Sequence, residues 1–218
     1  MWIPELLSLS ATFISFLYGL HHFFKRGKPL FLQSITMAMA CHSLGNIYHL
    51  CLMLTGRTVF EGFTPAYLGH IGFFLFFVAA SYGQMDRIVD DGSPALRPSR
   101  YLALIAPVCA ALLYIPNICY GCLSTVTRVS MLLVWVPALF SLYFNCKHAL
   151  IPDCDFGFVK AVKPYNILAV CLGFAELFAL TAQNQYHGIV FMVTSVIFSV
   201  FSIAIMFAAR KGAEKWMV

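Results

Sequence analysis

The sequence predicts an all-α integral membrane protein, a bundle of seven transmembrane helices. Only 11% of the 218 residues are charged, against about 25% in soluble domains, and the mean hydropathy is +0.81. Apolar stretches close to the ~20 residues needed to cross the hydrocarbon core recur along the chain. We therefore expect a single seven-helix domain over residues 1–218, without a separate soluble module.

Polar and turn-forming segments separate these stretches. The segment "KRGKP" follows the first one, and the longest break, "DRIVDDGSPALRPSR" over residues 86–100, holds two prolines and a glycine. The first stretch is expected to be a retained helix, because the basic cluster follows the apolar run, whereas a signal peptide has its charge in front. The predicted spans are 2–24, 30–54, 64–84, 101–118, 129–146, 164–184 and 188–209.

The basic residues predict the orientation. With seven spans, only Arg57 and Arg128 fall on one side of the membrane. Because basic residues gather in cytoplasmic loops, we expect the N-terminus outside and the C-terminus in the cytoplasm; which membrane is not indicated. The basic residues of the other side are Lys25, Arg26, Lys28, Arg87, Arg97, Arg100, Lys147, Lys160, Lys163, Arg210, Lys211 and Lys215.

The span spacing is compatible with a 3+1+3 parallel repeat. Adding 128 to the numbers of the first three spans gives ranges close to the last three, and aligns Leu44-Gly45 with Leu172-Gly173. Duplicated units of this kind occur in transporters. Evenly spaced helices would align in the same way without duplication, so both interpretations stay open.

The stretch "CHSLGNIYHL" (41–50) places polar side chains inside the second span. At 100° per residue, His42, Asn46 and His49 share an arc of about 60°. His70 lies in the third span, and Glu176 is the only acidic residue deep within a predicted span. Polar groups in hydrocarbon cost several kcal/mol each, so these five side chains are expected to face other helices or a cavity open to the outside.

A rise of about 1.5 Å per residue gives their depths. His42 and Glu176 each lie about 18 Å from the cytoplasmic start of their spans, so they are able to meet near the midplane. His70 lies about 9 Å below the outer surface. We therefore expect the five to line one cavity in the outer half of the bundle.

Several functions fit such a cavity. The first hypothesis is a small-solute transporter or permease, with Glu176 and His42 as protonatable groups and the others as lining, because histidine titrates near neutral pH. The alternative is a seven-helix sensor that binds a small molecule and signals to a cytoplasmic partner. Two or three histidines and a carboxylate also suit zinc or another transition metal, supplied by several helices because no HExxH motif is present. Interhelical packing alone is the remaining explanation.

Enzyme activity is the less favoured interpretation and is left open. The chain has no nucleophile elbow, phosphate-binding loop or paired-carboxylate motif, and its last span has no histidine for the HxxxH pair of seven-helix lipid amidases. No cofactor is indicated. The expected partners are the lipid bilayer and a small-molecule ligand, with a second copy of the chain or a cytoplasmic protein left open. Nucleic acid is not expected, because the basic residues lie in short loops.

The cytoplasmic stretch "YGQMDRIVDDG" (82–92) is the second candidate site. Its charged residues are expected to form a local ion-pair network, to bind a partner, or to lock an inward gate. A solvated helix end with charges one turn apart is the simpler explanation. The candidate residues are Asp86, Arg87, Asp90 and Asp91.

Overall fold

The computed structural model describes residues 2–23, 30–55, 63–119, 123–152, 157–184 and 188–216. Among these, seven helices are long and apolar enough to cross a membrane, which confirms that part of the prediction. All elements are helical: α1 Trp2–Phe23, α2 Leu30–Leu54, α3 Pro65–Ala80, η1 Ser81–Met85, α4 Asp86–Val89, η2 Pro94–Leu96, α5 Arg97–Ala103, α6 Ile105–Cys119, α7 Thr125–Leu150, α8 Phe158–Asn184 and α9 Gly188–Trp216.

Several helices extend beyond the predicted spans. α7 ends at Leu150 instead of 146, α8 begins at Phe158 instead of 164, and α9 reaches Trp216 instead of 209. The added residues are rich in Lys and Ala, which favour helix. The apolar run therefore sets the length of a span, whereas backbone hydrogen bonding carries the helix past it.

The predicted break at 86–100 is largely helical, which corrects the sequence-based boundary. α3 continues through η1, one wide turn of π-helix, into α4. After a short turn, α5 and α6 follow with a break at Leu104. Pro107 explains the break, because it has no N–H to donate to the carbonyl of Ala103, four residues earlier.

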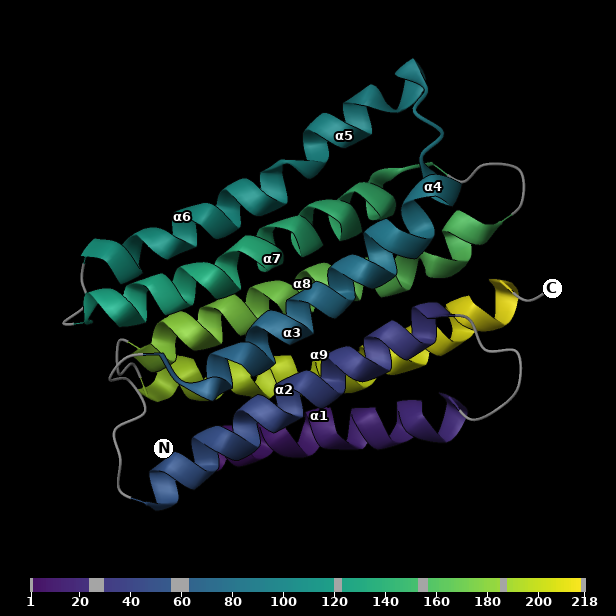
Figure 1. Cartoon of the computed structure of the whole chain (residues 1–218). Helices are drawn as coiled ribbons and strands as arrows, with labels where there is room; N and C mark the ends of the chain where they lie inside the picture. Colours follow the sequence, from purple (N-terminus) through teal and green to yellow (C-terminus); the bar gives the residue numbers. More distant parts are fainter. Residues whose placement is uncertain are drawn as a thin grey trace.

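The helices run side by side along one axis, and the two chain ends lie at opposite ends of the bundle (Figure 1). α2 packs between α1 and α3, and α8 packs between α7 and α9. The two groups meet where α3 contacts α7 and α1 contacts α9. α6 lies at one edge, against α7 and α8. This arrangement brings α2, α3 and α8, which carry the predicted cavity residues, into one region.

A close helix crossing joins α2 and α3 beside these residues. A Cβ atom added to Gly69 would lie 2.7 Å from the Cys41 carbonyl oxygen and 2.7 Å from the Gly45 Cα atom. Only residues without a side chain permit this approach. Cys41 precedes His42, Gly45 precedes Asn46, and Gly69 precedes His70, so the crossing fixes the separation of the histidines.

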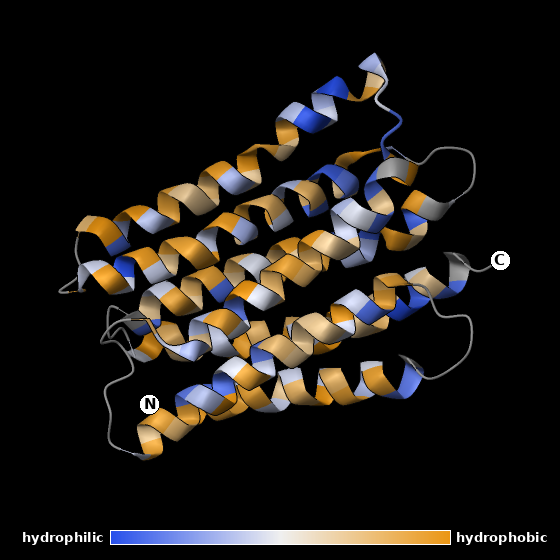
Figure 2. Cartoon of the chain, viewed as in Figure 1, coloured by the Kyte–Doolittle hydropathy of each residue, from blue (hydrophilic) through white to orange (hydrophobic). Residues whose placement is uncertain are grey.

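Hydropathy is unevenly distributed over the bundle. Hydrophilic residues gather at the end that carries α4 and the start of α5, and a second group lies on α2 toward the opposite end (Figure 2). Most of the remaining helix surface is apolar, with Leu44, Leu75, Leu112 and Ile189 each more than half exposed. The outer surface of the bundle is therefore the apolar one, while polar side chains lie inside it.

Candidate functional site

The three polar residues of α2 are buried along one face. The exposed fractions of His42, Asn46 and His49 are 1%, 2% and 4%. Their spacing of four and three residues follows the helical turn, so one face of α2 presents all three to α1, α3 and α8. The predicted polar stripe therefore faces other helices.

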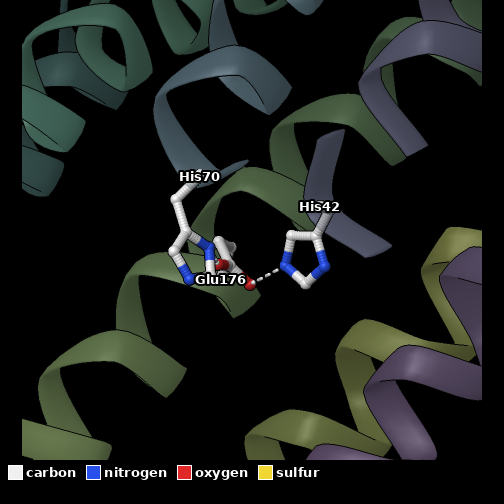
Figure 3. Close-up of side chains that lie close together, drawn as sticks. All are labelled: His42, His70 and Glu176. Atoms are coloured by element: carbon white, nitrogen blue, oxygen red, sulfur yellow. Dashed lines mark ion pairs between the residues drawn. The ribbon is translucent and has the colours of Figure 1, made fainter. Parts of the chain in front are cut away.

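Glu176 lies between two histidines from different helices (Figure 3). Its Oε1 atom is 2.7 Å from His70 Nδ1 on α3, and its Oε2 atom is 3.1 Å from His42 Nε2 on α2. The three ring and carboxylate groups are almost completely buried. Glu176 thus joins residues more than 100 positions away in the chain, and its contact with His42 agrees with the equal depths estimated for these two residues.

Polar and aromatic neighbours hold the His42 ring in place. Asn46 Nδ2 lies 3.1 Å from His42 Nδ1 and also donates to Ser8 Oγ on α1 at 3.1 Å. Phe198 on α9 stacks on the imidazole with ring centroids 4.5 Å apart, and Phe73 on α3 meets it edge-on at 5.1 Å. The ring therefore has little freedom to leave the carboxylate.

A second carboxylate, Glu5, belongs to the cluster and was missed by the sequence analysis. It lies in the first turn of α1 and is only 4% exposed. Its Oε1 atom is 3.7 Å from His49 Nδ1 and accepts a hydrogen bond from Gln183 on α8. We call the five residues Glu5, His42, His49, His70 and Glu176 the His/Glu cluster.

A sequence signal for Glu5 exists. It begins a stripe that continues through Ser8, Thr12 and Ser15 at steps of three and four residues, and all four side chains are buried. Gln183 lies in the last turn of α8, within the predicted span 164–184, and the sequence analysis did not single it out.

The space within the cluster is small. All five predicted residues, with Glu5, Ser8 and Gln183, line one cavity of about 20 Å³, enough for about one water molecule or a small ion. No lysine or arginine is among the described residues that line it. Two carboxylates and three imidazoles line the cavity, so the lining favours a proton, a metal ion or another small cation.

The candidates of the stretch 82–92 form a separate network with α5 and α7. Lys147 pairs with Asp86, and also with Asp90 at 3.1 Å. His148 Nε2 lies 2.9 Å from Asp86, and the Arg100 guanidinium contacts both carboxylate oxygens of Asp90 at 2.5 and 2.9 Å. We call these five residues the α4 network.

Of the remaining two candidates, only the Asp91 side chain is described. Asp91 accepts a hydrogen bond from the backbone N–H of Ser93 at 2.8 Å and points to the surface. The Arg87 side chain lies outside the described residues, as do the basic residues Lys25, Arg26, Lys28 and Arg57 that support the predicted orientation. Of the three earlier alternatives, intramolecular ion pairs account for Asp86 and Asp90.

These contacts shift the pKa values of the aspartates. Hydrogen bonds from the Arg100 guanidinium hold the pKa of Asp90 far below its usual range. Burial acts to raise the pKa of Asp86, but hydrogen bonds from His148 and Lys147 outweigh burial and lower it. The backbone N–H of Ser93 lowers the pKa of Asp91. Asp86 and Asp90 are therefore charged at neutral pH and bind α4 to α7.

Comparison of the chain with protein-family models, with curated proteins and with solved structures gives no match. Its function therefore has to be inferred from the two groups of residues described above.

Proposed function

We propose that the protein is a small-solute transporter or permease, in which the His/Glu cluster binds a proton together with a small, positively charged or protonatable solute. The observation that carries this proposal is Glu176, an ionisable residue buried within a membrane-length helix, with no lysine or arginine among the described residues that line its cavity. Ionisable groups at such positions are costly and mark ion or proton pathways by default. The imidazoles of His70 and His42 lie 2.7 and 3.1 Å from the Glu176 carboxylate oxygens, so the proton has alternative binding sites.

The predicted orientation assigns the two groups of residues to opposite ends of the transport path. With the N-terminus outside and the C-terminus in the cytoplasm, the His/Glu cluster lies in the outer half of the bundle and the α4 network at the cytoplasmic end. The cavity is too small for most solutes, so entry requires helix movement. The α4 network then acts as a latch on the inner end, because it binds α4, the continuation of α3, to α7. A 3+1+3 relation between the groups α1–α3 and α7–α9 is the matching architecture for such movement.

Solute uptake tests the proposal. The full chain is reconstituted into vesicles that contain a pH-sensitive dye, and amino acids, sugars, nucleosides and metal ions are added under a pH gradient. We expect at least one solute to drive proton movement in the wild type and none to do so in Glu176→Gln. His22→Gln is the matched control, because the His22 imidazole bonds the Tyr18 carbonyl elsewhere on α1. Equal proton movement in Glu176→Gln and the wild type contradicts the mechanism.

A sensor is the second candidate, and the continuity of α3 favours it. The helix that carries His70 runs through η1 directly into Asp86, so a shift of α3 on ligand binding would reach the α4 network. The two functions differ in the effect of Asp86→Asn. A sensor variant should keep ligand binding and lose partner coupling, whereas a transporter variant should change the uptake rate.

A further inference from the structure

We propose that His42, His70 and Glu176 bind one divalent transition-metal ion of the Zn²⁺ class. This ion is either the solute that the His/Glu cluster transports or an ion that stays bound there. Binding of the metal does not depend on the proposed function, whereas uptake of the metal rests on it. Two imidazoles and one carboxylate are a donor set found in zinc sites that keep an open coordination position.

The positions of the donor atoms fit this ion. One ligand atom from each of the three residues lies within 4.8 Å of the other two. Around a tetrahedral zinc ion with bonds of about 2.0–2.2 Å, ligand atoms are separated by about 3.4 Å. The carboxylate oxygens already lie 3.1 and 2.7 Å from the two rings. For all three donors to bind one ion, the widest pair has to close by up to about 1.4 Å, while the two carboxylate-to-ring contacts open by less than about 1 Å.

The hydrogen bonding of these groups leaves room for a ligand. His70 Nε2 is buried and has neither a hydrogen bond nor an ion pair within the described residues, while His42 Nε2, His70 Nδ1 and Glu176 Oε1 meet only in the two ion pairs. Buried polar atoms almost always have partners, and those without one call for an explanation such as an ion. A metal ion would satisfy one nitrogen of each ring and a carboxylate oxygen together.

Asn46 is placed to hold the His42 ring both with and without a bound metal ion. A ring that binds metal through Nε2 carries its proton on Nδ1, and a neighbouring acceptor then fixes this tautomer. The Asn46 amide faces Nδ1 at 3.1 Å, with Ser8 Oγ at the same distance from Nδ2. Rotation of the amide by 180° presents its oxygen to both groups, and the Ser8 hydroxyl is able to donate as well as accept.

The charge of the two carboxylates and the size of the cavity also fit a divalent metal ion. Glu176 and Glu5 together balance a dication in an environment that contains no lysine or arginine among the described lining residues. The cavity of about 20 Å³ has room for about one water molecule or one small ion, so it offers space for the metal ion itself. Imidazole donors favour zinc, cobalt, nickel and copper over magnesium and calcium, which prefer oxygen alone.

Metal binding to the purified full chain tests the inference. After treatment with a chelator, the protein in detergent is dialysed against ZnCl₂, and bound zinc is counted by elemental analysis, with MgCl₂ as the competing ion. We expect one zinc per chain, not displaced by magnesium. The matched variants His42→Gln, His70→Gln and Glu176→Gln should each raise Kd more than about 100-fold, since even supporting residues contribute 10–100-fold. His22→Gln should bind as the wild type does.

Two further variants guard against loss of folding. Glu176→His keeps the reach of the side chain and creates a three-histidine site, so it should retain zinc binding where Glu176→Gln loses it. Asn46→Ala should weaken binding by roughly 10–100-fold. Absence of stoichiometric zinc in the wild type, or equal affinity in the wild type and Glu176→Gln, overturns the inference.

The outcome is separable from that of the proposed function. Zinc bound through the three residues without any solute-driven proton movement supports the metal site and rejects transport. Proton movement that depends on Glu176 in a chain that binds no zinc rejects the metal site and supports transport.

Discussion

Substitution of Gly69 by alanine should force α2 and α3 apart and disturb the His/Glu cluster. The new Cβ atom would lie 2.7 Å from two backbone atoms of α2, 0.7 Å closer than the 3.4 Å at which ordinary contact begins. Backbone atoms of a packed helix do not rotate away as side chains do, so the helices have to separate. Overpacking of this kind costs about 1–3 kcal/mol.

Thermal unfolding of the detergent-purified variant measures this cost. For a chain of this length, each kcal/mol lowers Tm by roughly 2–4 °C, so Gly69→Ala should unfold roughly 2–12 °C below the wild type. Because Gly69 adjoins His70, the separation between the rings of His42 and His70, now 5.1 Å, should widen. Zinc affinity should then fall about tenfold or more, since sites tolerate displacements of only ~0.5 Å.

Gly83 provides the matched control. A Cβ atom there meets nothing within 4 Å, and alanine is favoured over glycine in helices by up to about 1 kcal/mol. Gly83→Ala should therefore be as stable as the wild type or slightly more stable. If Gly69→Ala shows the same Tm and zinc affinity as Gly83→Ala, the close crossing of α2 and α3 does not set the geometry of the site.

Two further predictions concern other parts of the bundle. Arg100 lowers the pKa of Asp90 in the folded protein. The ion pairs of Asp90 therefore stabilise the fold at pH values above about 3.9, the pKa of an aspartate in the unfolded chain, and this stabilisation is lost as the pH falls below that value. Asp90→Asn should lower Tm at neutral pH, and the difference in Tm from the wild type should shrink below about pH 4. Trp135 donates its Nε1–H to the Ala110 carbonyl at 3.0 Å, linking α7 to α6. Trp135→Phe should cost about 1–2 kcal/mol and speed amide hydrogen exchange in α6, and unchanged exchange there would contradict this role.

The polar residues show where reasoning from sequence succeeded. His42, Asn46 and His49 were placed on one face because helical periodicity is a local property. Their depth followed from the constant rise of the helix, which allowed Glu176 to be matched to His42. Glu5 was missed because it lies near the start of its span, whereas the sequence analysis considered only acidic residues deep within a span.

Membrane-length helices and their polar faces were determined by the sequence itself, because apolar length and helical periodicity depend on neighbouring residues. The tertiary structure alone decided that Glu176 lies between His42 and His70, that Glu5 joins them, and that Asp86 and Asp90 pair with α7. These contacts depend on which helices pack together, and on the approach that Gly45 and Gly69 permit. These contacts form between residues far apart in the chain, so the pattern of neighbouring residues does not predict them.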